Sequence, residues 1–337
     1  MNVLLTGGAG YIGSHTAVAL TNIGHKAVLF DNFSNSSEAV LEGLFRLVGR
    51  DLPFVKGDVR DTELLRAALE SYRVDAVLHF AGLKAVAESA QRPIDYYANN
   101  VQSSISLLQA MRDQKVKSLI FSSSATVYGE PQYLPLDENH GTGPTNPYGR
   151  SKLHIEEMLR DVAASDPQWS IICLRYFNPV GAHEAGLIGE SPNGPPDNLM
   201  PFIAQVASGE RGELTVFGGD YPTPDCTGVR DYIHVMDLAE GHAASLDFLK
   251  RSSGWHAVNL GTGKGHSVLE VVRMFEIVSG RQVPYRVSGR RAGDVAACYA
   301  DSRKAVELFG WEAKRTLKQM CSSAWHFQRS LRMGRVT

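Results

Sequence analysis

The stretch that decides the fold is Val3-Leu4-Leu5-Thr6-Gly7-Gly8-Ala9-Gly10-Tyr11-Ile12-Gly13, within a chain of 337 residues. Its apolar start is typical of a short buried parallel strand. Three of its glycines, Gly7, Gly10 and Gly13, stand three residues apart, and a helix is expected over 13–23. A glycine turn between a strand and a helix lets the backbone approach a pyrophosphate at the helix N-terminus. The stretch therefore predicts a dinucleotide site.

The strand–helix alternation continues beyond this turn. Short apolar runs predict further strands at 26–30, 53–55, 76–80, 118–121 and 170–174. Helical stretches such as 62–71 and 99–114 lie between them. Alternating strands and helices predict an α/β fold with a Rossmann-type, doubly wound parallel sheet.

The composition changes near Phe177. Residues 178–200 are rich in Gly, Pro and Asn and show little periodicity, so we expect a long loop that leads into a smaller C-terminal unit. Residues 1–177 are predicted to form the NAD-binding Rossmann domain, with 230–263 returning to its sheet. Residues 178–337 are predicted to form mainly the substrate-binding domain. The two units are thus expected to be interleaved, with the ligand cleft between them.

Bulk properties narrow the class of protein. The net charge of −2 provides no basic field for nucleic acid. The four cysteines are scattered without a CxxC pair, which favours reduced thiols in a cytoplasmic enzyme over a disulfide framework or a zinc site. Neither a signal peptide nor a membrane span is expected. The eleven histidines show no H-E-x-x-H pattern, so no metal is predicted.

A tyrosine and a lysine four residues apart suggest the chemistry. Tyr148 and Lys152 stand in N-P-Y-G-R-S-K, and positions i and i+4 share one face of a helix. A nearby cation favours phenolate, so we expect the pKa of Tyr148 to fall from about 10 towards the working pH. Such a base takes a proton from a sugar or alcohol hydroxyl. The alternative is that Lys152 is an ordinary solvated helix lysine.

Polar residues at two strand ends complete the expected dinucleotide site. Asp31 closes the second strand, where a carboxylate holds a ribose diol. Asn32 follows it where an NADP site would often have arginine, so NAD is favoured. Asp58, in G-D-V-R, contacts adenine or is a solvated turn carboxylate.

Taken together, these motifs resemble those of the extended short-chain dehydrogenase/reductase family, and within it those of the UDP-hexose 4-epimerases. The resemblance covers nearly the whole chain. It is carried by G-G-A-G-Y-I-G-S-H at 7–15, H-F-A-G-L-K-A-V at 79–86, S-S-S-A-T-V-Y-G at 122–129, P-Y-G-R-S-K at 147–152, R-Y-F-N-P-V-G-A-H at 175–183, N-L-M-P at 198–201, G-V-R-D-Y-I-H-V at 228–235 and R-R-A-G-D at 290–294.

The resemblance implies particular site residues. Tyr148 would be the base, Lys152 its electrostatic helper and Ser124 the hydroxyl partner. NAD would be held by Gly7, Gly10, Tyr11, Ile12, Gly13, Asp31, Asn32, Asn35, Asp58, Val59, Phe80, Ala81, Gly82, Lys84, Asn99, Ser122, Tyr148, Lys152 and Tyr176. The UDP-hexose would meet Lys84, Ser124, Tyr148, Asn178, Asn198, Leu199, Val216, Phe217, Arg230, Arg291, Asp294 and Cys298.

The resemblance also implies the reaction. It is the interconversion of UDP-glucose and UDP-galactose by hydride removal and return at sugar carbon 4, through a 4-keto intermediate with tightly bound NAD. Ala125 and Thr126 stand where related dehydratases and decarboxylases carry acidic residues, which disfavours both chemistries. Another NAD-dependent nucleotide-sugar oxidoreductase, or an NAD-sensing regulator on the same fold, is the alternative. The family also implies a homodimer, formed by the helices at 99–114 and 148–163.

Several substrate assignments have plain structural alternatives. Arg230 and Arg291 suit a diphosphate because guanidinium bonds two oxygens at once, but each could be a surface cation. Phe217 stacks near uracil or is a core aromatic. Cys298 is small where some family members carry tyrosine, which predicts room for the N-acetyl group of UDP-N-acetylglucosamine and UDP-N-acetylgalactosamine. Alternatively, Cys298 is packing and Tyr299 fills the gap.

Overall fold

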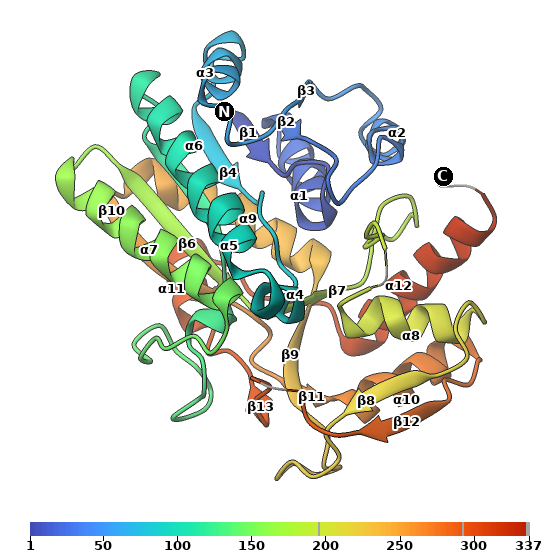
Figure 1. Cartoon of the computed structure of the whole chain (residues 1–337). Coiled ribbons are helices and arrows are strands. Elements are labelled where there is room, and N and C mark those ends of the chain that lie inside the picture. The colour runs from blue at the N-terminus through green and yellow to red at the C-terminus, as the bar shows by residue number, and fades with distance from the viewer. Residues whose placement is uncertain (195, 292, 335–337) are drawn as a thin grey trace.

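The computed structural model describes residues 1–194, 196–291 and 293–334 (Figure 1). Its main element is a seven-stranded sheet in which every pairing is parallel. In spatial order the strands are β10 (Gly254–Leu260), β6 (Ser170–Tyr176), β5 (Ser118–Ser124), β4 (Ala76–His79), β1 (Asn2–Thr6), β2 (Lys26–Asp31) and β3 (Phe54–Lys56). The Rossmann-type, doubly wound sheet predicted from the sequence is confirmed.

Helices cover both faces of this sheet, each over its own apolar core (Figure 1). One core includes side chains of α1 (Tyr11–Asn22), α2 (Ala39–Val48), α9 (Val235–Arg251) and α11 (Arg303–Phe309). The other includes α3 (Thr62–Ser71), α6 (Gln102–Asp113) and α7 (Pro147–Ser165). Because both faces are buried, the strands are continuous apolar runs, and this made them recognisable in the sequence.

Strand order places the dinucleotide turn at the centre of the sheet. β1 has β2 on one side and β4 on the other. The direction in which the chain adds successive strands to the sheet therefore reverses at β1. Thr6 pairs with His79, and the amide of Ala81 donates to the Thr6 carbonyl. The turns that follow β1 and β4 therefore lie side by side. In open α/β sheets, ligands bind at such a reversal, outside the carboxyl ends of the strands.

Short elements follow β4 and β5. The chain after β4 forms α4 (Val86–Gln91), α5 (Pro93–Tyr96) and a π-helical turn, η1 (Tyr97–Val101), before α6. After β5 it forms the 3-10 turn η2 (Ala125–Val127). The predicted helix at 99–114 is thus α6 preceded by a π-helical turn.

A second unit, which we call the C-terminal unit, has its own core and two small sheets. β9 (Val229–His234) pairs with β7 (Asn178–Val180), β11 (Gly265–Ser267) and β13 (Ala297–Cys298), and β8 (Leu214–Phe217) pairs with β12 (Tyr285–Ser288). Its helices are α8 (Leu199–Ala207), α10 (Val268–Ser279) and α12 (Leu317–Arg332), which share an apolar core.

The expected return of residues 230–263 to the main sheet is only partly right. β10 completes the main sheet and α9 packs on it, but residues 229–234 form β9 in the C-terminal unit. The sheet that β9 joins is set by its pairing with β7, β11 and β13, which lie far from it in sequence, and the local pattern V-R-D-Y-I-H does not show these partners.

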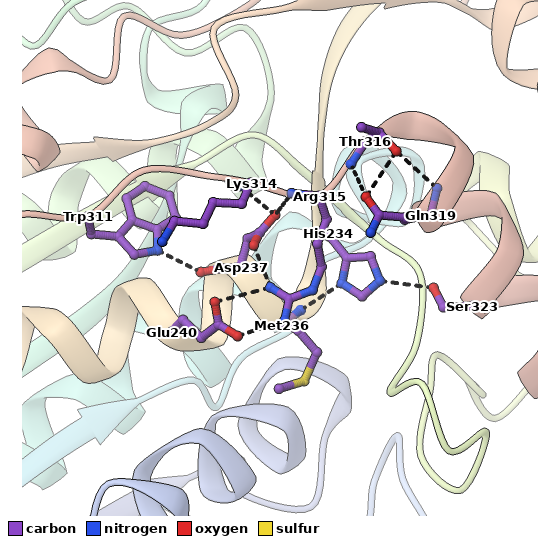
Figure 2. Close-up of polar contacts among 10 residues, drawn as sticks. All are labelled: His234, Met236, Asp237, Glu240, Trp311, Lys314, Arg315, Thr316, Gln319 and Ser323. Atoms are coloured by element: carbon purple, nitrogen blue, oxygen red, sulfur yellow. Dashed lines mark hydrogen bonds and ion pairs between the residues drawn. The ribbon is translucent and has the colours of Figure 1, made fainter.

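A polar junction ties α12 to α9 (Figure 2). The fully buried carboxylate of Asp237 accepts hydrogen bonds from the Arg315 guanidinium at 2.5 Å and from the backbone amides of Lys314 and Arg315. Arg315 also donates to Glu240 at 2.8 Å. Nearby, His234 Nε2 lies 3.0 Å from the Ser323 hydroxyl of α12. These contacts hold α12 close to α9, which covers one face of the main sheet.

Within the described ranges, no helix is both long and apolar enough to cross a membrane.

Candidate active site

One cleft of about 1170 Å³ lies at the carboxyl ends of the main strands and reaches the C-terminal unit. Its lining brings together nearly all the predicted site residues: Gly7, Gly10, Tyr11, Ile12, Gly13, Asp31, Asn32, Asn35, Asp58, Val59, Phe80, Ala81, Gly82, Lys84, Asn99, Ser122, Ser124, Tyr148, Lys152, Tyr176, Asn178, Asn198, Arg230, Arg291, Asp294 and Cys298. The cleft exceeds the usual 300–1,000 Å³ of a ligand pocket, so it has room for two large ligands.

The glycine turn has the shape that a pyrophosphate requires. Gly7 has φ +70°, and a Cβ there would lie 2.7 Å from the amide nitrogen of Ala81. A Cβ on Gly13 would collide with the carbonyl oxygen of Gly7. Gly10 is the N-cap of α1 and has no side chain over the helix end. The backbone at this end of α1 is therefore open to an anion, which fits the phosphates of a dinucleotide.

The carboxylates at the neighbouring strand ends are held in place by their own loops. Asp31, at the end of β2, accepts hydrogen bonds from the amides of Ala9 at 3.0 Å and Phe33 at 2.8 Å, and from Ser36 Oγ at 3.2 Å. Asp58 is bonded by the Arg60 side chain at 2.9 and 2.7 Å, which lowers the pKa of its carboxyl. Asp31 and Asp58 both line the cleft, where ribose or adenine donors of a dinucleotide could reach their carboxylate oxygens.

Helix α7 presents Tyr148 and Lys152 to the same cleft. Asn146 caps the helix by accepting a hydrogen bond from the Gly149 amide at 2.9 Å, and Pro147 opens the first turn. The cap places Tyr148 in the first turn and Lys152 one turn later on the same face. Lys152 Nζ donates to the Ser122 carbonyl at 2.7 Å and lies 4.8 Å from the centre of the Phe121 ring.

The expected lowering of the Tyr148 pKa is wrong for this structure. Burial raises the pKa of Tyr148, and a hydrogen bond with Ser124 opposes the rise without cancelling it. Burial also lowers the pKa of Lys152 to about 8, against which the Glu156 carboxylate acts. Lys152 Nζ is 6.0 Å from the centre of the Tyr148 ring and is turned towards Ser122. The lysine alone therefore does not outweigh the desolvation of the phenol.

Glu156 and Gly82 lie near Lys152. Glu156, one turn further along α7, forms a buried ion pair with Arg175 at 2.6 Å and accepts from Ser123 Oγ at 2.5 Å. On the other side, a Cβ on Gly82 would be 3.8 Å from Lys152 Nζ. The H-F-A-G turn after β4 and the ammonium of α7 therefore meet in the cleft.

Ser124 lies where β5 ends. Its hydroxyl oxygen accepts hydrogen bonds from the Thr126 amide at 3.2 Å and the Thr126 hydroxyl at 3.0 Å. With two donors already supplied, the Ser124 hydroxyl hydrogen is free to bond the Tyr148 oxygen or a ligand oxygen.

Most of the predicted substrate residues of the C-terminal unit line the cleft, and three do not. Arg230 and Cys298 are register partners on β9 and β13, and Arg230 lies 3.7 Å from Asp294. Arg291 stacks 3.8 Å above the Phe217 ring. Three predicted residues, Leu199, Val216 and Phe217, lie outside the cleft lining. Val216 is buried in the core of the C-terminal unit, and Phe217 contacts Arg291, which does line the cleft.

Among the lining residues that sequence reasoning missed, Glu190 has polar contacts with two predicted ones. Glu190 accepts hydrogen bonds from Lys84 Nζ at 2.7 Å and from Asn198 Nδ2 at 2.5 Å. It lies in the Gly- and Pro-rich segment between β7 and α8, which has no periodicity to show which side chains face inward. Only its position between two predicted site residues distinguishes it.

The fold and the cleft are those of a dinucleotide-binding α/β enzyme. A model of the NAD dependent epimerase/dehydratase family matches residues 3–261, and the chain belongs to this family. A UDP-glucose 4-epimerase of Neisseria gonorrhoeae is 54% identical over 328 residues, which covers 97% of each chain.

Solved structures agree with this placement. A UDP-glucose 4-epimerase from Stenotrophomonas maltophila, with bound NAD and formylated UDP-arabinopyranose, matches with a TM-score of 0.97 and 49% identity over 99% of both chains. One from Bifidobacterium longum, in complex with NAD+ and UDP, matches with a TM-score of 0.96 and 51% identity over 99% of this chain and 100% of that one.

Proposed function

We propose that the protein is an NAD-dependent epimerase that interconverts UDP-glucose and UDP-galactose at sugar carbon 4. The observation that carries the proposal is that Tyr148, Lys152 and Ser124 line the same cleft as the open glycine turn at the N-terminus of α1. The similarity of nearly the whole chain to UDP-glucose 4-epimerases supports it.

The residues that would hold NAD fit that group. The backbone at Gly7, Gly10 and Gly13 would receive the pyrophosphate, and Asp31 would accept the hydroxyls of a ribose. When bound, oxidised NAD supplies a hydride acceptor and a positive charge in the cleft. Lys152, held on the Ser122 carbonyl, is placed to donate to a further hydroxyl in the cleft.

The chain's own groups would move the proton. Tyr148 would take the proton of the sugar 4-hydroxyl, and Ser124 would bond the same oxygen. Burial opposes ionisation of the phenol, so added positive charge in the cleft is needed to favour phenolate. After the 4-keto sugar has presented its other face, return of a hydride to carbon 4 and of the proton from Tyr148 to the oxygen would complete the inversion. No outside oxidant is consumed.

The C-terminal unit would bind the nucleotide sugar. Arg230 and Arg291 line the cleft and bring two guanidinium groups to it, which suits a diphosphate. Under this proposal residues 1–177 with α9 and β10 hold the dinucleotide, and most of 178–337 holds the substrate. The last three residues of that range lie outside the described part of the chain.

A second substrate pair follows from Cys298. This small side chain lines the cleft beside Arg230, so the hexose pocket has space where a larger residue would fill it. We propose that UDP-N-acetylglucosamine and UDP-N-acetylgalactosamine are also interconverted.

Proton NMR of the purified protein with each UDP-sugar tests the reaction. Exchange of stereochemistry at carbon 4 without net NADH absorbance at 340 nm is expected. Steady accumulation of NADH would instead indicate a net oxidoreductase and would refute the epimerase proposal.

The proposed assembly is a cytoplasmic homodimer that pairs α6 and α7 with their copies. The stacking of Tyr97 on His154, with ring centres 5.7 Å apart, gives this face an aromatic surface. Sedimentation as a monomer at micromolar concentration would refute the dimer.

A further inference from the structure

Glu190 places a carboxylate in the cleft that is proposed to hold two phosphate-bearing ligands. Its side chain is 8% exposed. One oxygen, Oε1, accepts from Lys84 Nζ at 2.7 Å and from Asn198 Nδ2 at 2.5 Å. The other oxygen, Oε2, is buried and has no hydrogen-bond partner among the described residues.

An unpaired buried acceptor on a charged group destabilises a protein unless a ligand completes it. Phosphate oxygens cannot do so, because they accept hydrogen bonds and repel the carboxylate. A donor is required. In a nucleotide sugar and a dinucleotide, the donors that suit a carboxylate are hydroxyls, together with the amide and amine groups of the bases and nicotinamide.

The neighbours of Glu190 select among these donors. Lys84 comes from the turn after β4, and Asn198 is the N-cap of α8 in the C-terminal unit. Asn198 is a predicted substrate residue, Lys84 is predicted to contact both NAD and the substrate, and Glu190 lies on the same inter-element segment as Asn198. The reacting 4-hydroxyl is already assigned to Tyr148 and Ser124. We propose, on the basis of the proposed function, that Glu190 Oε2 accepts a hydrogen bond from a hexose hydroxyl other than the reacting one.

This contact would orient the sugar through a group that the diphosphate lacks. Oε1 meanwhile accepts hydrogen bonds from Lys84 of the turn after β4 and from Asn198 of the C-terminal unit, so the carboxylate links the two units. Glu190 is thus a specificity residue for the sugar, and it contributes nothing to recognition of UDP alone.

The substitution Glu190→Gln tests the two oxygens separately. The glutamine carbonyl can still accept from Lys84 and Asn198, while its NH2 group places a donor where Oε2 was an acceptor. Glu184→Gln is the matched control, because it removes one negative charge from an exposed position on the same segment. Equal melting temperatures of the three NAD-saturated proteins establish that the fold is intact.

Binding is measured by isothermal titration calorimetry with UDP, UDP-glucose and the 2-, 3- and 6-deoxy analogues of UDP-glucose. We expect Glu190→Gln to weaken UDP-glucose binding about 10- to 100-fold and to leave UDP binding equal or tighter. The deoxy analogue that lacks the hydroxyl bound by Glu190 should have equal affinity for wild type and for Glu190→Gln. This equality identifies the hydroxyl.

Three results would overturn the inference. One is an unchanged affinity for UDP-glucose, and another is an equal loss for UDP and every sugar nucleotide. The third is loss of bound NAD with normal sugar affinity once NAD is restored, which would assign Oε2 to the cofactor. If wild type binds no UDP-glucose at all, the proposed function itself fails.

Discussion

Lys152 Nζ lies 6.0 Å from the centre of the Tyr148 ring and donates its hydrogen bond to the Ser122 carbonyl. The two side chains share one face of α7 and one cleft, as the i, i+4 spacing requires. Lys152 is buried and Tyr148 is half-buried, and desolvation raises the pKa of the phenol while it lowers that of the ammonium to about 8. Ionisation of Tyr148 therefore depends on further positive charge brought by a ligand.

Removing the phenolic oxygen should abolish most of the proton transfer. Tyr148→Phe is expected to lower kcat by about 10²- to 10⁴-fold, the usual contribution of a general base. NAD should remain bound, because the expected contacts to its phosphates lie at the glycine turn. Steady-state rates and the NAD-to-protein ratio check both statements. Near-normal turnover would remove Tyr148 from the mechanism.

The arginine of β9 should contribute to diphosphate binding. Arg230→Ala is expected to raise the Kd for UDP about 10- to 100-fold, since charge-assisted hydrogen bonds are lost. The control is Arg286→Ala, whose guanidinium pairs with Glu213 at 2.7 Å and is 62% exposed. Titration calorimetry with UDP distinguishes the two. An equal affinity for UDP in both variants would contradict the assignment of Arg230.

The size of residue 298 should decide the substrate range. Cys298→Tyr is expected to lower kcat/KM for UDP-N-acetylgalactosamine at least about tenfold while UDP-glucose turnover is kept, because the larger side chain takes the space of the N-acetyl group. Cys298→Ser keeps the small volume and should leave both activities in place. If wild type does not turn over UDP-N-acetylgalactosamine, the pocket argument is wrong.

The junction of α9 and α12 should be important for stability (Figure 2). Arg315→Ala leaves the buried Asp237 carboxylate without its cation and should lower the free energy of unfolding by about 3–5 kcal/mol. Arg303→Ala breaks a pair whose guanidinium is 88% exposed, and it should cost about 0–1 kcal/mol. Urea unfolding at pH 7.5 measures both. Similar losses would mean that burial of Asp237 is compensated by its backbone donors.

Acid should destabilise the fold through buried histidines. His79 lies between the Thr6 hydroxyl at 2.6 Å and the Ser104 hydroxyl at 3.0 Å, and burial lowers its pKa from 6.5 to about 3. Between these values the unfolded chain binds a proton that the folded chain does not, so stability falls as pH falls below 6.5.

The substitution His79→Gln removes this titration. Between pH 7.5 and 5.5 the variant should lose about 1.4 kcal/mol less of its free energy of unfolding than wild type. Urea unfolding at the two pH values provides the comparison, and each protein serves as its own reference at pH 7.5. Identical pH dependence in the two proteins would show that the pKa of His79 is the same in the folded and the unfolded chain, which contradicts this prediction.

Local pattern was sufficient for the main sheet and the dinucleotide turn. The strands at 26–30 and 170–174 are continuous apolar runs because both faces of a parallel sheet are buried. Gly13 is required by a backbone contact within the same turn, and Gly7 has the left-handed φ of +70° that favours glycine. The face shared by Tyr148 and Lys152 follows from helix geometry. These features are set by neighbours in the chain.

What depends on distant contacts could be settled only in three dimensions. The sheet that β9 joins, the burial of Val216 and the contact of Glu190 with Lys84 bring together residues far apart in sequence. The pKa of Tyr148 is of the same kind, because desolvation is set by everything packed around the phenol. The chain alone determined which groups can act as base, cation and phosphate cradle; the tertiary structure decided their surroundings, since burial and charge are properties of the whole packed cleft.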